Sequence, residues 1–301
     1  MNSHATALDN QQLAATSRLF SSKVVREFAK KGKSATFARL VGDSALLKVL
    51  GEDLKNVSEV FDSAFNLLKR KNYRHEYIYK AAIAHRILLG KHSLNTAVLL
   101  NEFRTGKNKA DSVILNGTSS VYEIKSERDS LKRLDEQISS YRRVFATVNV
   151  IVAQKHLEDV VRSLPSDVGI FTLSDRYQIS EFREAQNLPD RTCALHIFDS
   201  IQLQEARIVL ERLGVEVPKV PNTKAYHTLK SLFSKLSSID AHNGMVEVLK
   251  ETRSKATSSD LINSLPISIQ PAVLSVTVNS KDHSKLLSAM STPVCEALKW
   301  N

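Results

Sequence analysis

Two residues near the middle of the chain have the types and spacing of a metal-dependent site. Glu123 and Lys125 stand two positions apart in segment 121–125, which is rich in strand-forming residues. Because side chains alternate along a strand, both project from one face and share a small patch. An acid and a base on the covered face of a sheet need partners, which a metal ion and a phosphate would supply. The alternative explanation is that Glu123 and Lys125 lie on a solvated edge of the strand.

Asp111 precedes this pair by one predicted strand. Segments 110–115 and 121–125 are separated by Asn116-Gly117-Thr118 and two serines, a composition that favours a hairpin. Asp111 shares a face with Glu123 if the loop holds an odd number of residues, such as three with Gly117 at positive φ. A two-residue Asn-Gly turn would separate the two carboxylates.

Converging carboxylates offer hard oxygen ligands, which suit Mg²⁺ or Mn²⁺ better than zinc. Such an ion polarises a phosphoryl group and lowers the pKa of a bound water molecule. Lys125 would orient that water or offset the charge that develops on the phosphate oxygens. We therefore predict catalytic roles for Asp111, Glu123 and Lys125.

A family resemblance rests on these residues. Asp111, eleven intervening residues and Glu123-Ile124-Lys125 resemble the signature of the PD-(D/E)XK nuclease superfamily, with Ala110 in place of the motif's proline. Gln137 and Tyr141 resemble the Q-x3-Y element that follows the catalytic strand in RecB-like members. The resemblance covers about residues 70–175, and segments 73–77, 102–107 and 122–126 are similar to an uncharacterised bacterial family within the superfamily.

The resemblance implies further site residues. Gln137 joins the catalytic set, and Glu102 and Glu76 correspond to positions that contribute extra carboxylates. The implied metal ligands are Asp111, Glu123, Glu102 and Glu76. Two simpler explanations stay open, because Glu76 and Lys80 have the spacing of a surface ion pair on a helix and Glu102 could be a solvated strand end.

A basic rim follows the predicted catalytic strand. The predicted nucleic-acid contacts are Arg128, Lys132, Arg133, Tyr141 and Arg142. Solubility is the default explanation of such a rim, but beside a metal site it would also track a phosphate backbone. Tyr141 lies on the apolar stripe of its helix, where a core role is the alternative, whereas Gln137 lies off that stripe.

The composition narrows the classes of function. The 301 residues carry a net charge of +10, with basic residues outnumbering acidic ones by 11 to 7 in 1–70, 17 to 12 in 71–180 and 14 to 13 in 181–301. This excess fits a polyanionic partner. Cys193 and Cys295 lack the spacing of a zinc site. The sequence shows no recognisable Ser-His-Asp set for covalent catalysis and no glycine-rich loop for binding a nucleotide phosphate. A polar amino terminus and the lack of a long apolar run predict a soluble, cytoplasmic protein without a membrane partner.

The hydrophobic pattern predicts the elements that must position the site. Helices are expected over 10–70, with a break at 30–33, and over 73–89. Strands at 96–103, 110–115 and 121–125 form a meander, and a helix with Asp129 as N-cap extends to Phe145. A strand at 148–153, a helix at 156–163 and a strand at 168–173 follow, and the signals beyond Asp175 are helical.

This order predicts an α/β fold with a restriction-endonuclease-like core of helix, three-strand meander, helix and strand, in a mixed sheet of four to five strands. Three regions are expected: an N-terminal helical region at 1–70, the PD-(D/E)XK nuclease-like core at 71–180 and a mainly helical C-terminal region at 181–301.

The predicted function is Mg²⁺- or Mn²⁺-dependent hydrolysis of phosphodiester bonds. DNA is favoured over RNA as the substrate, and the resemblance implies a 5′-phosphate product. By analogy with the superfamily, the expected role is prokaryotic genome defence or mobile-element biology. The alternative is a catalytically inactive nuclease-fold module that binds nucleic acid or a protein. The sequence leaves open endo- or exonuclease action and the oligomeric state, a homodimer included.

Overall fold

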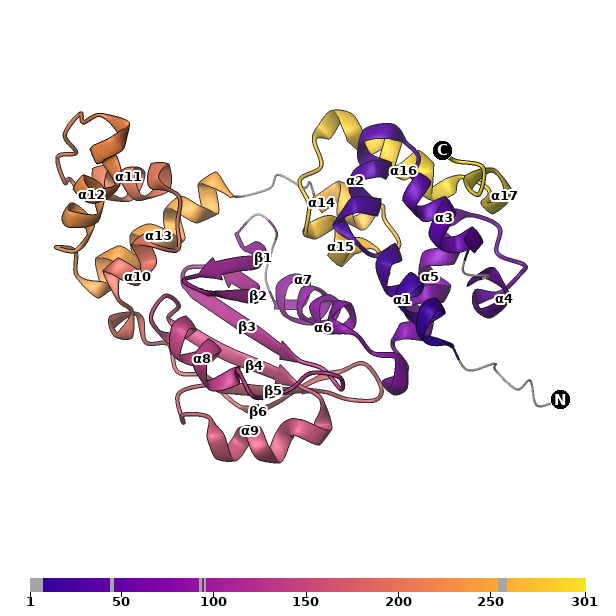
Figure 1. The fold of residues 1–301 in the computed structure, drawn as a ribbon, viewed down its shortest axis with the longest axis horizontal. Coiled ribbons are helices and arrows are strands. Elements are labelled where there is room, and N and C mark those ends of the chain that lie inside the picture. The colour runs from indigo at the N-terminus through magenta and orange to yellow at the C-terminus, as the bar shows by residue number, and fades with distance from the viewer. Residues whose placement is uncertain (1–7, 44–45, 92–93, 95, 254–258) are drawn as a thin grey trace. The chain divides into compact units, whose positions relative to one another are not determined.

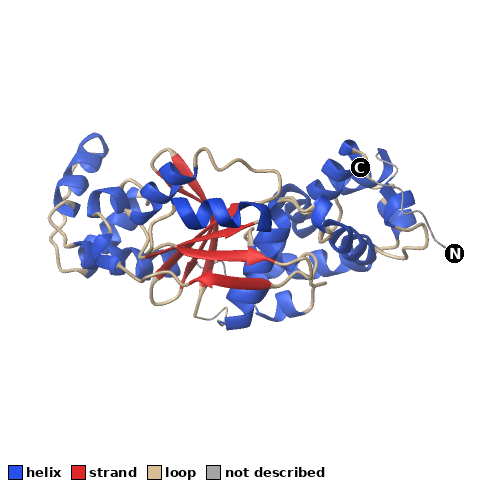
Figure 2. Cartoon of the chain, turned by 90° about the horizontal axis from the view of Figure 1, so that it is seen from below, coloured by secondary structure: helices blue, strands red, loops and turns tan. Residues whose placement is uncertain are grey.

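The computed structural model describes residues 8–43, 46–91, 94, 96–253 and 259–301. The chain divides into two compact units, one comprising Met1–His85 and Lys255–Asn301 and the other Arg86–Ser254. The strands gather in one sheet and the other regular elements are helices (Figure 1, Figure 2). Within the described residues, none of the helices has the length and apolar character that crossing a membrane requires.

The first unit is built from helices at both ends of the chain. They are α1 (Asn10–Leu19), α2 (Ser22–Lys31), α3 (Ala35–Asp43), α4 (Leu46–Leu50), α5 (Val57–Leu68), α6 (Glu76–Ala82), α14 (Ser259–Asn263), α15 (Gln270–Leu274), α16 (His283–Ser291) and α17 (Val294–Ala297), with 3-10 turns at Lys71–Tyr73 and Ser280–Asp282. Gly32 ends α2 at a φ of 69°, which confirms the predicted break, because glycine adopts this left-handed conformation without strain.

Aromatic side chains form the core of the first unit. The ring of Phe28 lies 6.1 Å from that of Phe61 and 5.8 Å from that of Trp300. The backbone amide of Val57 donates to the carbonyl of Thr292 at 3.1 Å. Segments that are distant in sequence therefore build one core.

The helix predicted at 73–89 is present. A 3-10 turn occupies Lys71–Tyr73, and the helix α6 begins after it, at Glu76. A π-helical segment (Ile83–Leu88) and then α7 (Leu89–Lys91) follow α6 directly.

The second unit contains a six-stranded mixed sheet whose strands lie in sequence order. The strands are β1 (Val98–Thr105), β2 (Asn108–Leu115), β3 (Ser119–Lys125), β4 (Thr147–Val152), β5 (Gly169–Leu173) and β6 (Ile179–Arg183). The predicted meander is confirmed, because β1, β2 and β3 pair antiparallel. β3, β4 and β5 pair parallel, and β6 returns antiparallel as an edge strand beyond the four to five strands expected.

The helix between β3 and β4 is shorter than predicted. α8 spans Leu134–Arg142 with Arg133 as N-cap, so the prediction of a start at Asp129 was wrong. The Asp129 carboxylate instead accepts hydrogen bonds from the backbone amide of Ser126, at 2.8 Å, and from its hydroxyl, at 2.5 Å. These contacts turn the chain immediately after β3 and delay the helix by about one turn.

Helices of the same unit share an apolar cluster with the sheet. These are α8, α9 (Leu157–Ser163), α10 (Ala194–Phe198), α11 (Leu203–Arg212), α12 (Asn222–Phe233) and α13 (Ser238–Thr252), with 3-10 turns at Gln154–His156 and Pro189–Arg191. Val121 and Val150 from the sheet share one apolar cluster with Ile138 of α8 and Val209 of α11. The helices after β6 are thus divided between the units, α10–α13 with the sheet and α14–α17 with the amino-terminal helices.

Candidate functional site

The loop between β2 and β3 has the odd length that brings Asp111 into line with Glu123. It comprises residues 116–118, with Gly117 at a φ of 70° and the amide of Asn116 donating to the carbonyl of Thr118 at 3.0 Å. The paired residues run from Leu115 opposite Ser119 to Ser112 opposite Tyr122. Extending this register by one residue places Asp111 opposite Glu123, so both belong to the same sheet face.

Regular pairing of β2 with β3 ends where Asp111 begins. One carboxylate oxygen of Asp111, Oδ2, accepts the backbone amide of Ile124 at 2.7 Å. The side chain of Asp111 is therefore fixed against β3 next to Glu123, while it remains half-buried.

Glu102 lies on β1 at the position next to Asp111 of β2. The register of β1 with β2 pairs Asn101 with Ser112 and Phe103 with Ala110, so Glu102 falls opposite Asp111. Its φ is 59°, a conformation that costs a non-glycine residue about 1–3 kcal/mol and that clusters at functional sites.

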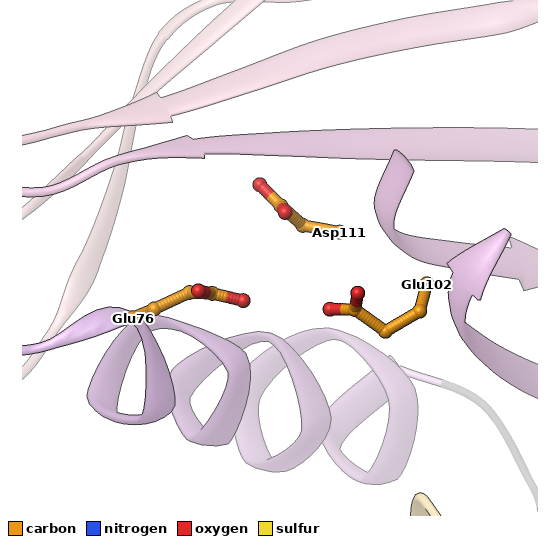
Figure 3. Close-up of side chains that lie close together, drawn as sticks. All are labelled: Glu76, Glu102 and Asp111. Carbon is orange, nitrogen blue, oxygen red and sulfur yellow. The ribbon is translucent and has the colours of Figure 1, made fainter. Parts of the chain in front are cut away.

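The carboxylates of Glu102 and Asp111 lie close together. One oxygen of Glu102 is within 4.8 Å of one of Asp111, and both side chains are drawn in Figure 3. Lys109 Nζ lies 2.6 Å from Glu102 Oε2, and both side chains are exposed. Carboxylate oxygens are the type of ligand that small divalent cations bind, so these two residues could hold such an ion.

Glu123 is held by three side chains. Lys125 Nζ donates to Glu123 Oε1 at 2.8 Å, Gln137 Nε2 donates to the same oxygen at 2.5 Å, and the Tyr141 hydroxyl donates to Oε2 at 2.8 Å. Lys125 Nζ also donates to Gln137 Oε1 at 2.8 Å. Glu123 is only 1% exposed, so its charge is stabilised by these partners rather than by solvent.

Burial and charge keep Tyr141 protonated. Burial is the largest cause that raises the pKa of its hydroxyl, and the negative charge of Glu123 and the hydrogen bond to Glu123 raise it further. Asp111 adds a smaller contribution of the same sign, because its carboxylate is also near. The Tyr141 hydroxyl therefore remains a hydrogen-bond donor to Glu123 at neutral pH.

α8 positions Gln137 and Tyr141 because they stand four residues apart on one helix face. Leu134 and Ile138 of the same helix are buried in the apolar cluster of the sheet and fix its orientation. The Thr105 carbonyl accepts a hydrogen bond from the Ser140 hydroxyl at 3.3 Å, which ties α8 to the end of β1.

Glu76 stands in the first turn of α6, in the first unit. Lys80 Nζ lies 2.5 Å from Glu76 Oε1, which is the surface ion pair that their spacing allows. Glu76 is labelled with Glu102 and Asp111 in Figure 3, and its role as a metal ligand stays a prediction.

Three of the five predicted nucleic-acid contacts are exposed, whereas one is buried and one is ion-paired within the protein. Arg128, Lys132 and Arg133 are exposed. Tyr141 is fully buried, so its side chain supports Glu123 and does not form part of the exposed rim. Arg142 is ion-paired with Asp167, its Nη2 lying 2.9 Å from Oδ1.

Sequence reasoning missed two contributors near the site. Lys109 was not singled out, although the turn between β1 and β2 is visibly basic, with Arg104, Lys107 and Lys109. Asn108 Oδ1 accepts a hydrogen bond from Arg133 Nη2 at 3.3 Å, which connects that turn to the start of α8. No sequence signal identifies such a contact between segments.

A serine and a histidine also meet, but not as a catalytic pair. Ser119 Oγ lies 2.8 Å from His242 Nε2, and Asn243 Oδ1 lies 3.0 Å from His242 Nδ1. Ser119 and His242 are 0% and 1% exposed, so a substrate cannot reach them. The Ser119 hydroxyl also accepts the amide of Ala146 at 3.1 Å, which is a structural role.

Comparison with known proteins gives three findings. A solved protein of unknown function from Silicibacter pomeroyi is similar to 42% of this chain over 87% of its own length, at 21% identity and a TM-score of 0.26. Protein cII of Enterobacteria phage P4 is 30% identical over 184 residues, which are 59% of this chain and 67% of that protein. The family described as Bacteriophage P4 protein cII matches residues 69–277, a segment that contains every candidate site residue discussed above. Because this match covers more than half of the sequence, the chain belongs to the bacteriophage P4 protein cII family.

Proposed function

We propose that this protein is a metal-dependent phosphodiesterase that hydrolyses nucleic acid, with DNA as its substrate and a PD-(D/E)XK nuclease-like core. The observation that carries the proposal is the alignment of Glu102, Asp111 and Glu123 across three adjacent strands, with Lys125 two residues from Glu123 on the same strand. The order of elements adds support, since a three-strand meander, α8 and β4 follow one another as the resemblance to PD-(D/E)XK nucleases implies.

The carboxylates have different environments, which suggests different tasks. Glu102 and Asp111 present oxygens close together at an accessible position and would hold Mg²⁺ or Mn²⁺, with Glu123 of the adjoining strand as a further ligand. A divalent ion bound there would polarise the phosphoryl group and lower the pKa of a water molecule.

Lys125 and Gln137 supply the other groups that the reaction needs. The Lys125 ammonium offers positive charge to phosphate oxygens, and Gln137 fixes its position through a 2.8 Å hydrogen bond. Tyr141 holds the Oε2 atom of Glu123, so that Glu123 and Lys125 keep their relative orientation.

The test is cleavage of DNA by the full chain in Mg²⁺, comparing the wild type with Asp111→Asn and Lys125→Ala. Asp135→Asn is the matched control, because Asp135 is an exposed carboxylate on α8. We expect Asp111→Asn and Lys125→Ala each to lower the cleavage rate by about 100-fold or more, while DNA binding in EDTA and the control's activity stay unchanged. Cleavage at the wild-type rate by Asp111→Asn would show that the proposed site is wrong.

A second candidate is a catalytically inactive module of the same fold that binds nucleic acid or a protein. The observation that favours it is the burial of Glu123, whose two oxygens are already occupied by Lys125, Gln137 and Tyr141. A buried, fully bonded ion pair needs no metal to persist. This candidate predicts binding without metal-dependent cleavage under any of the conditions above.

A further inference from the structure

The hairpin of β1 and β2 places residues of like charge opposite each other twice. The register pairs Arg104 with Lys109, and Glu102 falls opposite Asp111 two positions further along the strands. Residues that are directly opposite in an antiparallel pair project from the same face of the sheet, and like charges there are destabilising. A basic pair, Arg104 and Lys109, therefore stands beside an acidic pair, Glu102 and Asp111, although mixed pairs of acid and base would be more stable.

Lys109 is connected to the acidic pair by an exposed ion pair. Its Nζ lies 2.6 Å from Glu102 Oε2, and 57% of the Lys109 side chain and 44% of the Glu102 side chain are exposed. Such a pair contributes little to stability, because solvent screens its charges and both long side chains lose freedom. Arg104 is exposed as well. Both cations are therefore accessible from solvent, and the ammonium is not tightly fixed to Glu102.

The backbone of the hairpin is fixed next to the buried part of the site. Gly106 and Lys107 form a two-residue turn, with Gly106 at a φ of 57°, and such a short turn sets the register of the two strands. The Tyr141 hydroxyl lies 3.1 Å from the carbonyl oxygen of Lys109 and 2.8 Å from Glu123 Oε2. Tyr141 thus holds the Lys109 backbone beside the buried carboxylate, so that a rearrangement of Lys109 involves its side chain alone.

The arrangement of these charges matches a metal ion with a phosphate beside it. Two residues along a strand span about 6.5–7 Å, so the basic pair lies within the length of one long side chain of the acidic pair. A cation held by the two carboxylates and an anion held between Arg104 and Lys109 would remove both repulsions. Solubility explains exposed charges in general, but it does not explain why charges of the same sign are paired across the strands.

We infer that Arg104 and Lys109 bind a phosphate group of the nucleic-acid substrate beside the metal ion, and that Lys109 leaves Glu102 when the ion binds there. A divalent ion takes carboxylate oxygens as ligands and repels an ammonium group on the same carboxylate. The released ammonium joins Arg104 on the opposite strand, and the two cations bind a phosphate through charge-assisted hydrogen bonds. The inference rests on the proposed function for the metal ion and for the class of substrate.

The first test is binding of Mn²⁺ to the metal-free full chain, measured by titration calorimetry for the wild type, Lys109→Gln and Lys107→Gln. Lys107 is the matched control, because it is exposed in the turn of the same hairpin and its substitution removes the same charge. We expect Lys109→Gln to bind Mn²⁺ about 2- to 5-fold more tightly than Lys107→Gln, since the ion no longer displaces an ammonium from Glu102. Equal affinities, or weaker binding by Lys109→Gln, would overturn the exchange.

The second test is binding of duplex DNA with and without the ion. Each substitution is added to Lys125→Ala, whose lowered cleavage keeps the DNA intact, and binding is measured in Mn²⁺ and in EDTA at about 150 mM salt. In Mn²⁺ we expect Lys109→Gln and Arg104→Gln each to weaken binding by about 10-fold or more, because each loses a charge-assisted hydrogen bond to phosphate. In EDTA Lys109→Gln should resemble Lys107→Gln, because Lys109 is then paired with Glu102.

The dependence on the ion separates a phosphate site from general attraction. A loss in Lys109→Gln that is the same in EDTA as in Mn²⁺ would show diffuse attraction of DNA to positive charge and would overturn the inference. DNA binding in Mn²⁺ that equals that of Lys107→Gln, in either Lys109→Gln or Arg104→Gln, would overturn it as well. Lys109→Arg keeps the charge and should recover most of the binding, once thermal unfolding shows that the variants fold.

The outcomes distinguish this inference from the proposed function. A chain that cleaves DNA in Mg²⁺ but fails these comparisons contradicts the role of Arg104 and Lys109 alone. A chain that does not cleave, yet binds DNA through Arg104 and Lys109 when Mn²⁺ is present, contradicts the proposed hydrolysis and leaves the phosphate site in place. A wild type that binds no Mn²⁺ contradicts both.

Discussion

At the scale of single residues, the hydroxyl of Tyr141 is the contact with the clearest consequence. It lies 2.8 Å from Glu123 Oε2 and 3.1 Å from the carbonyl oxygen of Lys109. Tyr141→Phe removes this hydroxyl and leaves a buried carboxylate oxygen short of a donor. We expect the free energy of unfolding to fall by about 1.5–3 kcal/mol and the cleavage rate to fall as well. Urea unfolding and DNA cleavage measure the two effects, and equal stability of wild type and variant would contradict the assigned contact.

His242 gives a prediction about pH. Burial lowers the pKa of His242 from its ordinary 6.5, and the hydrogen bond to Asn243 opposes the shift less strongly. The unfolded chain therefore binds a proton at a higher pH than the folded chain does. The stability that this histidine contributes is complete above about pH 6.5 and is lost as the pH falls toward the lower folded pKa.

The measurement is the free energy of unfolding between pH 7.5 and pH 5.5, which are about one unit either side of the ordinary histidine pKa. We expect the wild type to lose stability more steeply than His242→Gln, by at most about 1.4 kcal/mol per pH unit. His227→Gln, which changes an exposed imidazole, is the control and should follow the wild type. Parallel slopes in wild type and His242→Gln would show that this histidine does not titrate differently on unfolding.

At the scale of elements, hydrophobic periodicity predicted the main helices and strands, but local side-chain contacts decided where some of them begin and end. Asp129 has the residue type of an N-cap, yet it bonds back to Ser126 and α8 begins at Leu134. β6 was missed because its five residues are mostly exposed, so they lack the buried alternation that marks a strand. Its pairing with β5 depends on a neighbour that no local pattern reveals.

The candidate site was predictable where it depends on register. The three-residue loop around Gly117 determines which positions of the two strands face one another. The alternation of side chains along each strand then determines which of them share a face of the sheet. The sequence could not show that Tyr141 bonds to Glu123, because that contact depends on how α8 rests on the sheet. Nor could it show the φ of 59° at Glu102, since glutamate seldom adopts that conformation.

The crossing of α11 and α13 gives the prediction for packing between elements. A Cβ atom added at Gly244 would lie 2.7 Å from Val209 Cγ1, which is closer than nonbonded carbon atoms approach. We expect Gly244→Ala to destabilise the protein by about 1–3 kcal/mol. Gly42→Ala is the matched control, because Gly42 is in α3 and, among the described residues beyond its own helix, none lies within 4 Å of the added atom. This control should stabilise by about 0.5–1 kcal/mol, and thermal unfolding of both variants would show whether the close approach matters.

At the scale of the whole molecule, the division into two units should be visible in unfolding. Phe61 is buried in the first unit and Ile151 in the second, each with 0% exposure. Phe61→Ala and Ile151→Ala each remove buried atoms at a cost of about 2–5 kcal/mol. If the units unfold separately, each variant lowers one calorimetric transition, and a loss of about 3 kcal/mol corresponds to roughly 6–12 °C for units of this size.

Differential scanning calorimetry of the full chain therefore distinguishes two arrangements. Separate transitions, each moved by one variant, would mean that the sheet with its candidate site is stable without support from the helices built by the two chain ends. A single transition that both variants lower equally would contradict this expectation and show that the two cores depend on each other. In that case a substitution such as Phe61→Ala would also reduce cleavage near its unfolding temperature, although Phe61 lies in the core of the other unit.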